Sequence, residues 1–430
     1  MSAASARTQK TGNTVKIEGV ACPFCPLLCD DLVIEQSGTK LAVSANACPR
    51  ARTGFEKPVR SLSPRIKGKP VSLDAAIDAA SSILRKSRQP LLSGLATDVN
   101  GMRAAIALAE STAGVLDHMH GDALNNNYRV LQSRGWMTTS LTEIRNRADL
   151  IVFVGTDASR FHRFYERIIW PPHAMFEPKP VKRELVYIGN GLKSRPAGAP
   201  KGLKSNQLKC KPEQLGEVTG AVNAVLLEQP LKNSIGAIKP DDIEALATRL
   251  QQAKYSVIIW APGELPPDNG EQIIDSICAL VDTLNIKTRS AGFILGGNDG
   301  ATTAANVTAW LTGYPLRVSF ARGYADYDPE AYNTANLLES GAVDSVLWLS
   351  ALNADNKLPA TGKLPAIVIA DSDKAFDKEP DVFIPAGIPG VDHKGTLIRC
   401  DSVVSLPLQQ LRDNGHPAAA EILKAIHAKL

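Results

Sequence analysis

Residues 150–154 read Leu-Ile-Val-Phe-Val, an uninterrupted apolar run that ends at a glycine. A strand with one solvated face alternates apolar and polar residues, whereas an uninterrupted run indicates a strand buried on both faces, as in a parallel sheet. Similar short runs recur along the chain at residues 91–95, 185–188, 257–260, 292–295, 346–349 and 367–370. The pattern therefore predicts parallel sheets covered on both sides.

Helical patterns lie between these runs. Ser72 is a suitable N-cap for a helix whose apolar residues recur at helical spacing from Leu73 to Leu84. Residues 242–252 and 272–284 have the same periodicity. Because strands alternate with helices, we expect an α/β protein with doubly wound parallel sheets.

A length of 430 residues is roughly three times the usual domain size of ~150 residues, so more than one core is expected. The turn-forming pair Gln229-Pro230 is the predicted divide. We expect an N-terminal cysteine-cluster segment at residues 1–60, a first α/β unit at 61–230, and a second unit with a C-terminal segment at 231–430. Residues 192–211 are rich in Gly, Pro and Lys and predict a long loop.

Composition excludes several classes of protein. The net charge of +4, from 48 basic and 44 acidic residues, does not favour nucleic acid as the main partner. The chain has no apolar run near the ~18 residues that a membrane-spanning helix needs. Residues 1–13 are polar and lack the apolar core of a signal peptide, so we expect disorder up to about Thr14 and a cytoplasmic location.

Four of the seven cysteines cluster near the N-terminus. Cys22-Pro-Phe-Cys25-Pro-Leu-Leu-Cys29 is a C-x2-C-x3-C pattern, and Cys48 follows in a later segment. Four thiolates suit a [4Fe–4S] cluster or a four-cysteine zinc site, and three within eight residues favour iron–sulfur. The alternative is a vestigial loop whose thiols pack as small apolar groups. The remaining cysteines are scattered and predict core packing: Cys210, Cys278 and Cys400.

The cysteine pattern, followed by Asp30-Asp31, resembles the N-terminal segment of molybdopterin oxidoreductases. More narrowly, the chain resembles the B-type subunit of formylmethanofuran dehydrogenase along almost its whole length. The stretches that carry this resemblance are residues 148–155, 306–315, 320–324 and 381–396. The resemblance implies a molybdopterin-oxidoreductase-like fold with two doubly wound units, in a one-carbon enzyme complex that acts on a formyl group carried by a furan cofactor.

One position departs from the family pattern. In redox members, a cysteine or selenocysteine binds the metal of the pterin cofactor and is followed by His-Gly. The matching stretch here is His118-Met119-His120-Gly121, which places Met119 at the thiolate position. A thioether is neutral and a much poorer donor to a high-valent metal than a thiolate. This departure predicts a chain without the redox metal.

Two further cofactor positions differ. Relatives follow the second strand of the pterin site with Asp-Pro-Arg, whereas here residues 185–188 end in Gly189-Asn190. After residue 154, Asp157 adds a carboxylate near the place of a pyrophosphate, which is electrostatically unfavourable. These changes predict a pterin site that has decayed, so molybdopterin or tungstopterin is expected to be absent.

The resulting interpretation is a non-redox B-type subunit of a formyltransferase/hydrolase complex. Resemblance to that assembly implies an A subunit that hydrolyses the formyl carrier, a D subunit that transfers formyl to a tetrahydropterin, and a C subunit that also lacks redox chemistry. Two alternatives stay open. One is a redox-active tungsten or molybdenum formylmethanofuran dehydrogenase subunit of the B type with a [4Fe–4S] cluster, and the other is a free-standing zinc protein built on the same thiolates.

His120 and Arg322 are the candidate catalytic residues. The resemblance implies that the counterpart of His120 lies beside the metal, and Arg322 lies in a motif that resembles the substrate-side segment of relatives. Without a metal, a hydrogen-bonded structural histidine is the alternative for His120. For Arg322 the alternative is a buried arginine paired with Asp326 or Asp328.

Residues 179–211 carry nine basic residues against one acid, Glu184. A solvated loop or a subunit interface is the simpler interpretation. The family resemblance implies a furan carrier with a glutamate-rich tail, which such a strip could attract through long-range electrostatics. Nucleic acid is not expected, because no aromatic side chains are interleaved with these cations. The basic residues are Lys179, Lys182, Arg183, Lys193, Arg195, Lys201, Lys204, Lys209 and Lys211.

Overall fold

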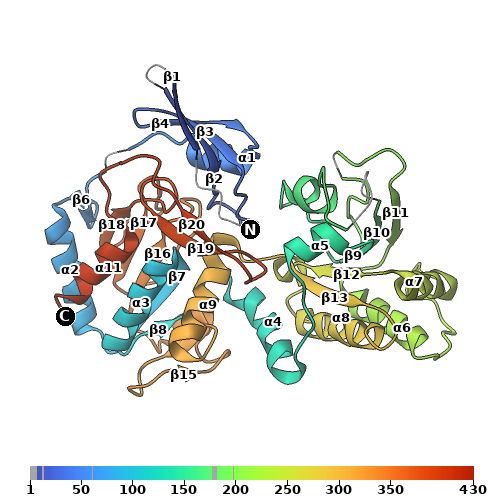
Figure 1. The fold of residues 1–430 in the computed structure, drawn as a ribbon. Coiled ribbons are helices and arrows are strands. Elements are labelled where there is room, and N and C mark those ends of the chain that lie inside the picture. Colours follow the sequence, from blue (N-terminus) through green and yellow to red (C-terminus); the bar gives the residue numbers. More distant parts are fainter. Residues whose placement is uncertain (1–6, 12–13, 61, 177–181, 197) are drawn as a thin grey trace. The chain divides into compact units, whose positions relative to one another are not determined.

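The chain divides into two units at residues 121/122 and 296/297 rather than at Gln229-Pro230. The structure, a computed structural model, describes residues 7–11, 14–60, 62–176, 182–196 and 198–430 (Figure 1). Unit 1 comprises Met1–Gly121 and Gly297–Leu430, and unit 2 comprises Asp122–Gly296. The two predicted α/β units, 61–230 and 231–430, do not match this division, because strands on both sides of residue 230 pair within one sheet of unit 2.

The N-terminal segment of unit 1 forms a small antiparallel sheet of its own. It contains β1 (Arg7–Thr11), β2 (Thr14–Val20), β3 (Leu32–Ser37) and β4 (Lys40–Ala45) in sequence order, followed by helix α1 (Pro49–Phe55). The expected disorder up to about Thr14 is therefore wrong for residues 7–11, since β1 pairs with β2 along its length. Backbone hydrogen bonds can fix such a strand without apolar side chains. Residues 1–6 and 12–13 lie outside the described residues.

The main sheet of unit 1 is mixed. Its strand order is β15-β14-β8-β7-β16-β17-β18-β5-β6, and the central strands from β8 to β18 run parallel. The outer strands β5, β6, β14 and β15 pair antiparallel. The bounds are β5 (Arg65–Ile66), β6 (Lys69–Pro70), β7 (Pro90–Ala96), β8 (Val115–Leu116), β14 (Val318–Ser319), β15 (Asp326–Tyr327), β16 (Ser345–Ser350), β17 (Ala366–Asp371) and β18 (Val382–Ala386).

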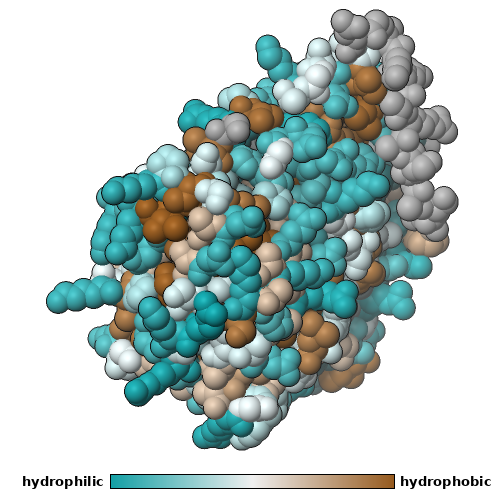
Figure 2. Space-filling model, turned by 90° about the vertical axis from the view of Figure 1, so that its left-hand side faces the viewer, coloured by the Kyte–Doolittle hydropathy of each residue, from teal (hydrophilic) through white to brown (hydrophobic). Residues whose placement is uncertain are grey.

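Helix α2 (Leu73–Lys86) confirms the predicted start at Ser72, whose hydroxyl accepts a hydrogen bond from the Ala75 amide at 3.2 Å. Such a cap typically contributes about 1 kcal/mol. The remaining helices of unit 1 are α3 (Val99–Ser111), α9 (Ala301–Thr312), α10 (Thr334–Ser340) and α11 (Ala419–His427), and β19 (Gly395–Ile398) pairs with β20 (Ser405–Leu408). No helix in the described ranges is long and apolar enough to cross a membrane. On the face drawn in Figure 2, hydrophobic residues form separate patches among hydrophilic ones.

Unit 2 contains a five-stranded parallel sheet in the order β11-β10-β9-β12-β13. The predicted strand at 150–154 is β9 (Leu150–Val154), and the others are β10 (Glu184–Ile188), β11 (Lys204–Leu208), β12 (Ser256–Trp260) and β13 (Ser290–Ile294). The predicted loop at 192–211 thus contains an edge strand, β11, whose Lys, Ser and Asn gave no apolar signal. The helices are α4 (Gly121–Arg134), α5 (Leu141–Arg147), α6 (Leu215–Leu226), α7 (Pro240–Gln252) and α8 (Gly270–Leu284).

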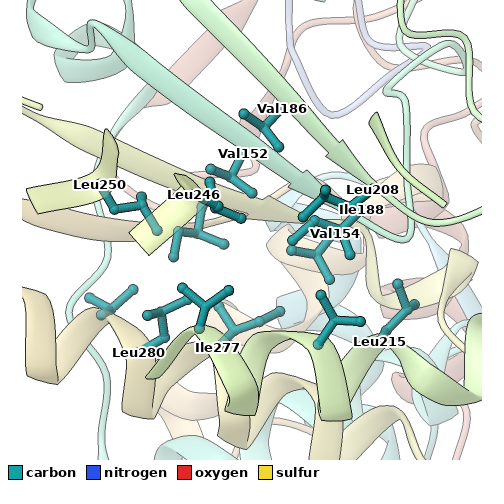
Figure 3. Close-up of a cluster of buried hydrophobic side chains, with 14 of the residues drawn as sticks. Val152, Val154, Val186, Ile188, Leu208, Leu215, Leu246, Leu250, Ile277 and Leu280 are labelled. Atoms are coloured by element: carbon teal, nitrogen blue, oxygen red, sulfur yellow. The ribbon is translucent and has the colours of Figure 1, made fainter. Parts of the chain in front are cut away.

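The core of unit 2 lies between this sheet and helices α6, α7 and α8. Val152, Ile188 and Leu208 point from the strands toward Leu215 and Ile277 on the helices (Figure 3). Burying one such aliphatic side chain contributes roughly 1.5–3 kcal/mol. Cys210 and Cys278 belong to the same cluster, which confirms the core packing expected for them.

Candidate functional site in unit 1

A five-residue loop, Asp117 to Gly121, follows the short strand β8 and forms the centre of the candidate site. The amide of Asp117 donates to the Leu92 carbonyl on β7 at 3.2 Å, and the amide of Met119 donates to the Gly94 carbonyl at 3.3 Å. The loop is therefore attached along β7 and follows the carboxyl end of β8. Open parallel sheets bind ligands at the carboxyl ends of their strands, which is where this loop lies.

Asp117 anchors the loop through a buried ion pair that the sequence did not reveal. Its Oδ1 accepts a hydrogen bond from Arg317 Nε at 3.3 Å, and its Oδ2 accepts two from the amide and hydroxyl of Thr334. The exposed side-chain fractions are 3% for Asp117 and 5% for Arg317. Burial raises the pKa of Asp117, and the guanidinium opposes that shift. Two residues 200 positions apart cannot be matched from spacing alone.

Asp299 connects the two histidines of the loop. His120 Nε2 lies 2.8 Å from Asp299 Oδ2, and His118 Nε2 lies 3.2 Å from the Asp299 carbonyl. The His120 amide donates to His118 Nδ1 at 3.0 Å. Although burial opposes it, the hydrogen bond from His120 holds the pKa of Asp299 below its ordinary value. His120 is therefore hydrogen-bonded to Asp299, as a structural histidine would be. Its catalytic role stays a prediction.

Acidification should destabilise the protein through His118. Burial, reinforced by His120, lowers the pKa of His118 to about 3, whereas an unfolded histidine titrates near ~6.5. Between these values the unfolded chain binds one proton more, so the free energy of unfolding should fall by up to about 1.4 kcal/mol per pH unit as the pH drops. Urea unfolding between about pH 7 and pH 5 should show a steeper loss for wild type than for His118→Gln. Equal slopes would contradict this prediction.

Met119 packs among apolar side chains. It is half-buried and contacts one cluster that includes Leu28 and Leu352, and a second that includes Trp348 and Phe383. A thioether in such surroundings behaves as a flexible hydrophobic filler. The expectation that Met119 stands at a metal-binding position stays a prediction, and the contacts described here are packing contacts.

The four N-terminal cysteines come together in the structure. Cys22 and Cys29 are buried and Cys25 and Cys48 are partly buried, and the Cys22 amide donates to the Cys29 carbonyl at 2.8 Å. The thiols of Cys25, Cys29 and Cys48 lie near enough to Cys22 to contribute to the rise of its pKa. Cys48 is also the N-cap of α1, where its sulfur accepts the Ala51 amide at 3.4 Å. Thiolate sulfur is the donor type that holds a [4Fe–4S] cluster.

Burial favours the protonated form of Cys22 and Cys25. It raises the pKa of Cys22 well above its ordinary value and that of Cys25 to about 12. A metal would therefore have to displace protons on binding. Within the described ranges, no group of three or more His, Cys, Asp or Glu side chains is arranged so that it could hold a metal ion. The metal role of the cysteines accordingly stays a prediction.

The sequence missed two neighbours of the cysteine loop. Cys400 is buried, in agreement with the core packing expected for it. It also contacts the cysteine loop, because its amide donates to the Pro26 carbonyl at 3.0 Å and its thiol interacts with that of Cys25. Arg50 also acts on Cys25, and its Nη1 donates to Asn298 Oδ1 at 3.1 Å. Asn298 precedes Asp299, so this contact connects the cysteine loop to the Asp117–Gly121 loop. Contacts between such distant segments leave no sequence signal.

Arg322 lies apart from this network. Its side chain is 66% exposed and pairs with Asp326 at 3.5 Å and with Tyr324. The pairing with Asp326 is confirmed, but the burial expected with it is wrong, because residues 321–324, between β14 and β15, are exposed. Arg317 is the buried arginine of this region. The catalytic role of Arg322 stays a prediction.

In unit 2, the two predicted sites of cofactor loss lie after neighbouring parallel strands. Asp157 follows β9 and Gly189-Asn190 follows β10. The Asp157 carboxylate accepts hydrogen bonds from the amides of Ser159 and Lys193, each at 2.9 Å. No carboxylate or guanidinium follows β10 at 189–191. The absence of a pterin dinucleotide stays a prediction.

Most of the basic segment is exposed. Lys182, Lys193, Arg195, Lys201, Lys204, Lys209 and Lys211 have exposed side chains. Arg183 is buried and donates to the Ile169 carbonyl at 2.8 Å, which is a structural contact. Lys179 lies outside the described residues. Lys204 begins an edge strand, where lysine also prevents pairing with other chains.

Comparisons with known proteins agree with the fold and with the family resemblance. No protein-family model matches the chain. It is 26% identical over 432 residues to the B-type subunit of the tungsten-containing formylmethanofuran dehydrogenase 2 of Methanocaldococcus jannaschii, covering 96% of this chain and 98% of the relative. It is 29% identical over 345 residues to the B-type subunit of the formyltransferase/hydrolase complex Fhc of Methylorubrum extorquens, covering 77% and 87%.

Two solved structures are also similar. The FhcABCD complex from Methylorubrum extorquens, crystallised with methylofuran, contains a chain that matches with a TM-score of 0.73 and 27% identity, covering 85% of this chain and 98% of that one. Acetylene hydratase from Pelobacter acetylenicus matches with a TM-score of 0.60 at 11% identity, covering 96% and 69%. The second likeness shows the fold alone. Together they confirm a mixed α/β fold that resembles a molybdopterin enzyme.

Proposed function

From its homology to the B-type subunits of formylmethanofuran dehydrogenase and of the Fhc complex, we propose that this chain is a non-redox B-type subunit of a cytoplasmic formyltransferase/hydrolase complex. The complex would act in one-carbon metabolism on a formyl group attached to a methanofuran-type carrier. The chain itself would contribute assembly and positioning, with no pterin cofactor of its own.

The packing of Met119 carries this proposal. A side chain that binds a catalytic metal must present a donor atom to an open position, whereas Met119 contacts apolar side chains of two clusters. Loss of one directly bound ligand and of its supporting contacts is difficult to compensate. The replacement of Asp-Pro-Arg by Gly189-Asn190 supports the same conclusion from unit 2.

The proposed partners are subunits of the A, C and D types. The related Fhc structure is a complex of four kinds of subunit with bound methylofuran. For this chain, we propose that exposed cations at residues 182–211 attract the anionic tail of such a carrier. The attraction would act at long range and weaken at high salt, because exposed charges are screened within about 8–10 Å near physiological ionic strength.

A redox-active B-type subunit is the second candidate. The four retained thiols favour it, as does the similarity to two tungsten-containing subunits that each cover 96% of this chain. In that case electrons would pass through a cluster on Cys22, Cys25, Cys29 and Cys48.

Viologen reduction separates the two candidates. We expect the complex of all four subunits, purified from cells grown with molybdate and tungstate, to hydrolyse the formyl carrier and to reduce no viologen dye. A functional formate-releasing complex is the positive control, because it shows that the assembly is active. Carrier-dependent dye reduction that stops when Cys22 is replaced by serine would favour the redox candidate.

We further propose that the four thiols hold one [4Fe–4S] cluster. Anaerobically purified protein should then contain about four iron atoms and four sulfides per chain and absorb in the visible region. Cys48→Ser should lower the iron content, whereas Cys278→Ala, in the core of unit 2, should leave it unchanged. Iron-free protein, or equal iron in both variants, would contradict this proposal.

A further inference from the structure

Asp157 lies at a position where α/β sheets normally bind a ligand. The chain places β10 and β11 on one side of β9 and β12 and β13 on the other. The strand order therefore reverses beside β9. Ligands of such sheets bind outside the carboxyl ends of the strands at this reversal, and anionic groups are held there by backbone amides. Asp157 is the third residue after β9.

The Asp157 carboxylate already uses amides from both adjoining loops. Oδ1 accepts the amide of Ser159, in the loop after β9, at 2.9 Å. Oδ2 accepts the amide of Lys193, in the loop after β10, at 2.9 Å. The exposed fraction of Asp157 is 9%. Burial opposes ionisation, but the hydrogen bonds from Ser159 and Lys193 outweigh it and lower the pKa of Asp157, so the group is a carboxylate at neutral pH.

The surrounding structure holds this carboxylate in place. The hydroxyl of Tyr165 donates to the Asp157 carbonyl at 2.7 Å and lies 2.9 Å from the hydroxyl of Tyr187 on β10. Gly155 and Ala158, on either side, both have left-handed backbone conformations, with φ of 68° and 55°. The ammonium of Lys193 adds positive charge nearby. Two amides and a cation thus converge on one anionic group that belongs to the chain itself.

We propose that the Asp157 carboxylate takes the place of a phosphate or pyrophosphate group at this sheet edge and excludes such ligands. This inference rests on the proposed function, because a subunit without a pterin dinucleotide has to satisfy the amides that the dinucleotide would otherwise bind. Removal of the carboxylate should expose those amides to an external oxyanion.

Chemical rescue with inorganic pyrophosphate tests the inference on the full chain. Asp157→Ala frees both amides and opens the space, so its melting temperature should fall by about 2–10 °C. Pyrophosphate should restore roughly half of that loss, compared with chloride at the same ionic strength, and should bind at least about tenfold more tightly than to wild type. In Asp157→Asn the amide group still fills the space, so the melting temperature should fall without rescue.

A carboxylate at the opposite end of the same strand supplies the matched control. Asp149 accepts the amides of Lys254 and Tyr255, each at 2.9 Å, beside the amino end of β9. Asp149→Ala loses the same number of amide contacts, and pyrophosphate should not restore its melting temperature. If Asp157→Ala does not fold, Asp157→Ser keeps one acceptor and should show the same rescue with a smaller initial loss.

Failure of this inference and failure of the proposed function would give different results. Equal rescue of Asp149→Ala, no binding to either alanine variant, or tight pyrophosphate binding to wild type would each overturn the inference. None of these results affects the proposed function. Extractable pterin in the wild-type complex would instead overturn the proposed function, whatever the variants show.

Discussion

Asp117→Ala should lower the free energy of unfolding of unit 1 by about 3–5 kcal/mol, one of the two largest effects expected in this chain. The substitution leaves the guanidinium of Arg317 buried without its carboxylate, since only 5% of that side chain is exposed. It also removes the acceptor of two hydrogen bonds from Thr334. Because Asp117 begins the loop that contains Met119 and His120, loss of the pair should also loosen that loop. Urea unfolding measures the change.

Arg322→Ala is the control for this prediction. Arg322 also pairs with an aspartate, but its side chain is 66% exposed, and exposed pairs contribute only about 0–1 kcal/mol. Comparison of the two variants tests whether the loss of unfolding free energy depends on the burial of the ion pair rather than on its presence. Similar losses for Asp117→Ala and Arg322→Ala would contradict the account.

Gly94→Ala should be destabilising by about 3–5 kcal/mol. Gly94 has a φ of +80°, and a Cβ atom there would lie 2.6 Å from the Leu349 carbonyl oxygen and 2.9 Å from the Trp348 ring. The nearest obstacle is backbone on β16, which cannot rotate away. The Gly94 carbonyl also accepts the Met119 amide, so a displaced β7 should shift the candidate site.

Gly313→Ala separates the backbone strain of a positive φ from the close approach to β16, the two causes of the loss expected for Gly94→Ala. Gly313 has a nearly identical φ of +86°, but a Cβ atom added there would meet nothing within 4 Å among the described residues. It should therefore cost only the backbone strain of about 1–2 kcal/mol. Guanidinium unfolding should show a clear gap between the two variants. A Gly94→Ala loss no larger than that of Gly313→Ala would show that the close approach to β16 is unimportant.

Much of the local structure could be predicted from the sequence. The run at residues 150–154 is β9, and Ser72 caps α2 as expected, because both signals lie within a few neighbouring residues. The division into units could not be predicted, since the chain leaves unit 1 at residue 121 and returns at 297, so unit 1 is built from two segments far apart in sequence. Strands β11 and β1 were missed because polar edge strands depend on backbone pairing rather than on apolar patterning.

The candidate site was predictable only where it contains a motif. The cysteine pattern and the substitution at Met119 are visible in the sequence, and the structure shows the four thiols together and the thioether in an apolar contact. The partners that define their surroundings, Arg317 for Asp117 and Asp299 for His120, come from segments about 180–200 residues away. Such pairs follow from topology, which one sequence does not supply.

The most direct test of the central claim is the tungsten, molybdenum and pterin content of the four-subunit complex purified from cells grown with both metals. We expect neither metal in stoichiometric amount and no extractable pterin. Met119→Cys should give the same result, because the residues after β10 are still Gly189-Asn190 rather than the expected Asp-Pro-Arg. One tungsten or molybdenum atom per chain, with a matching amount of pterin, in the wild-type complex would contradict the account.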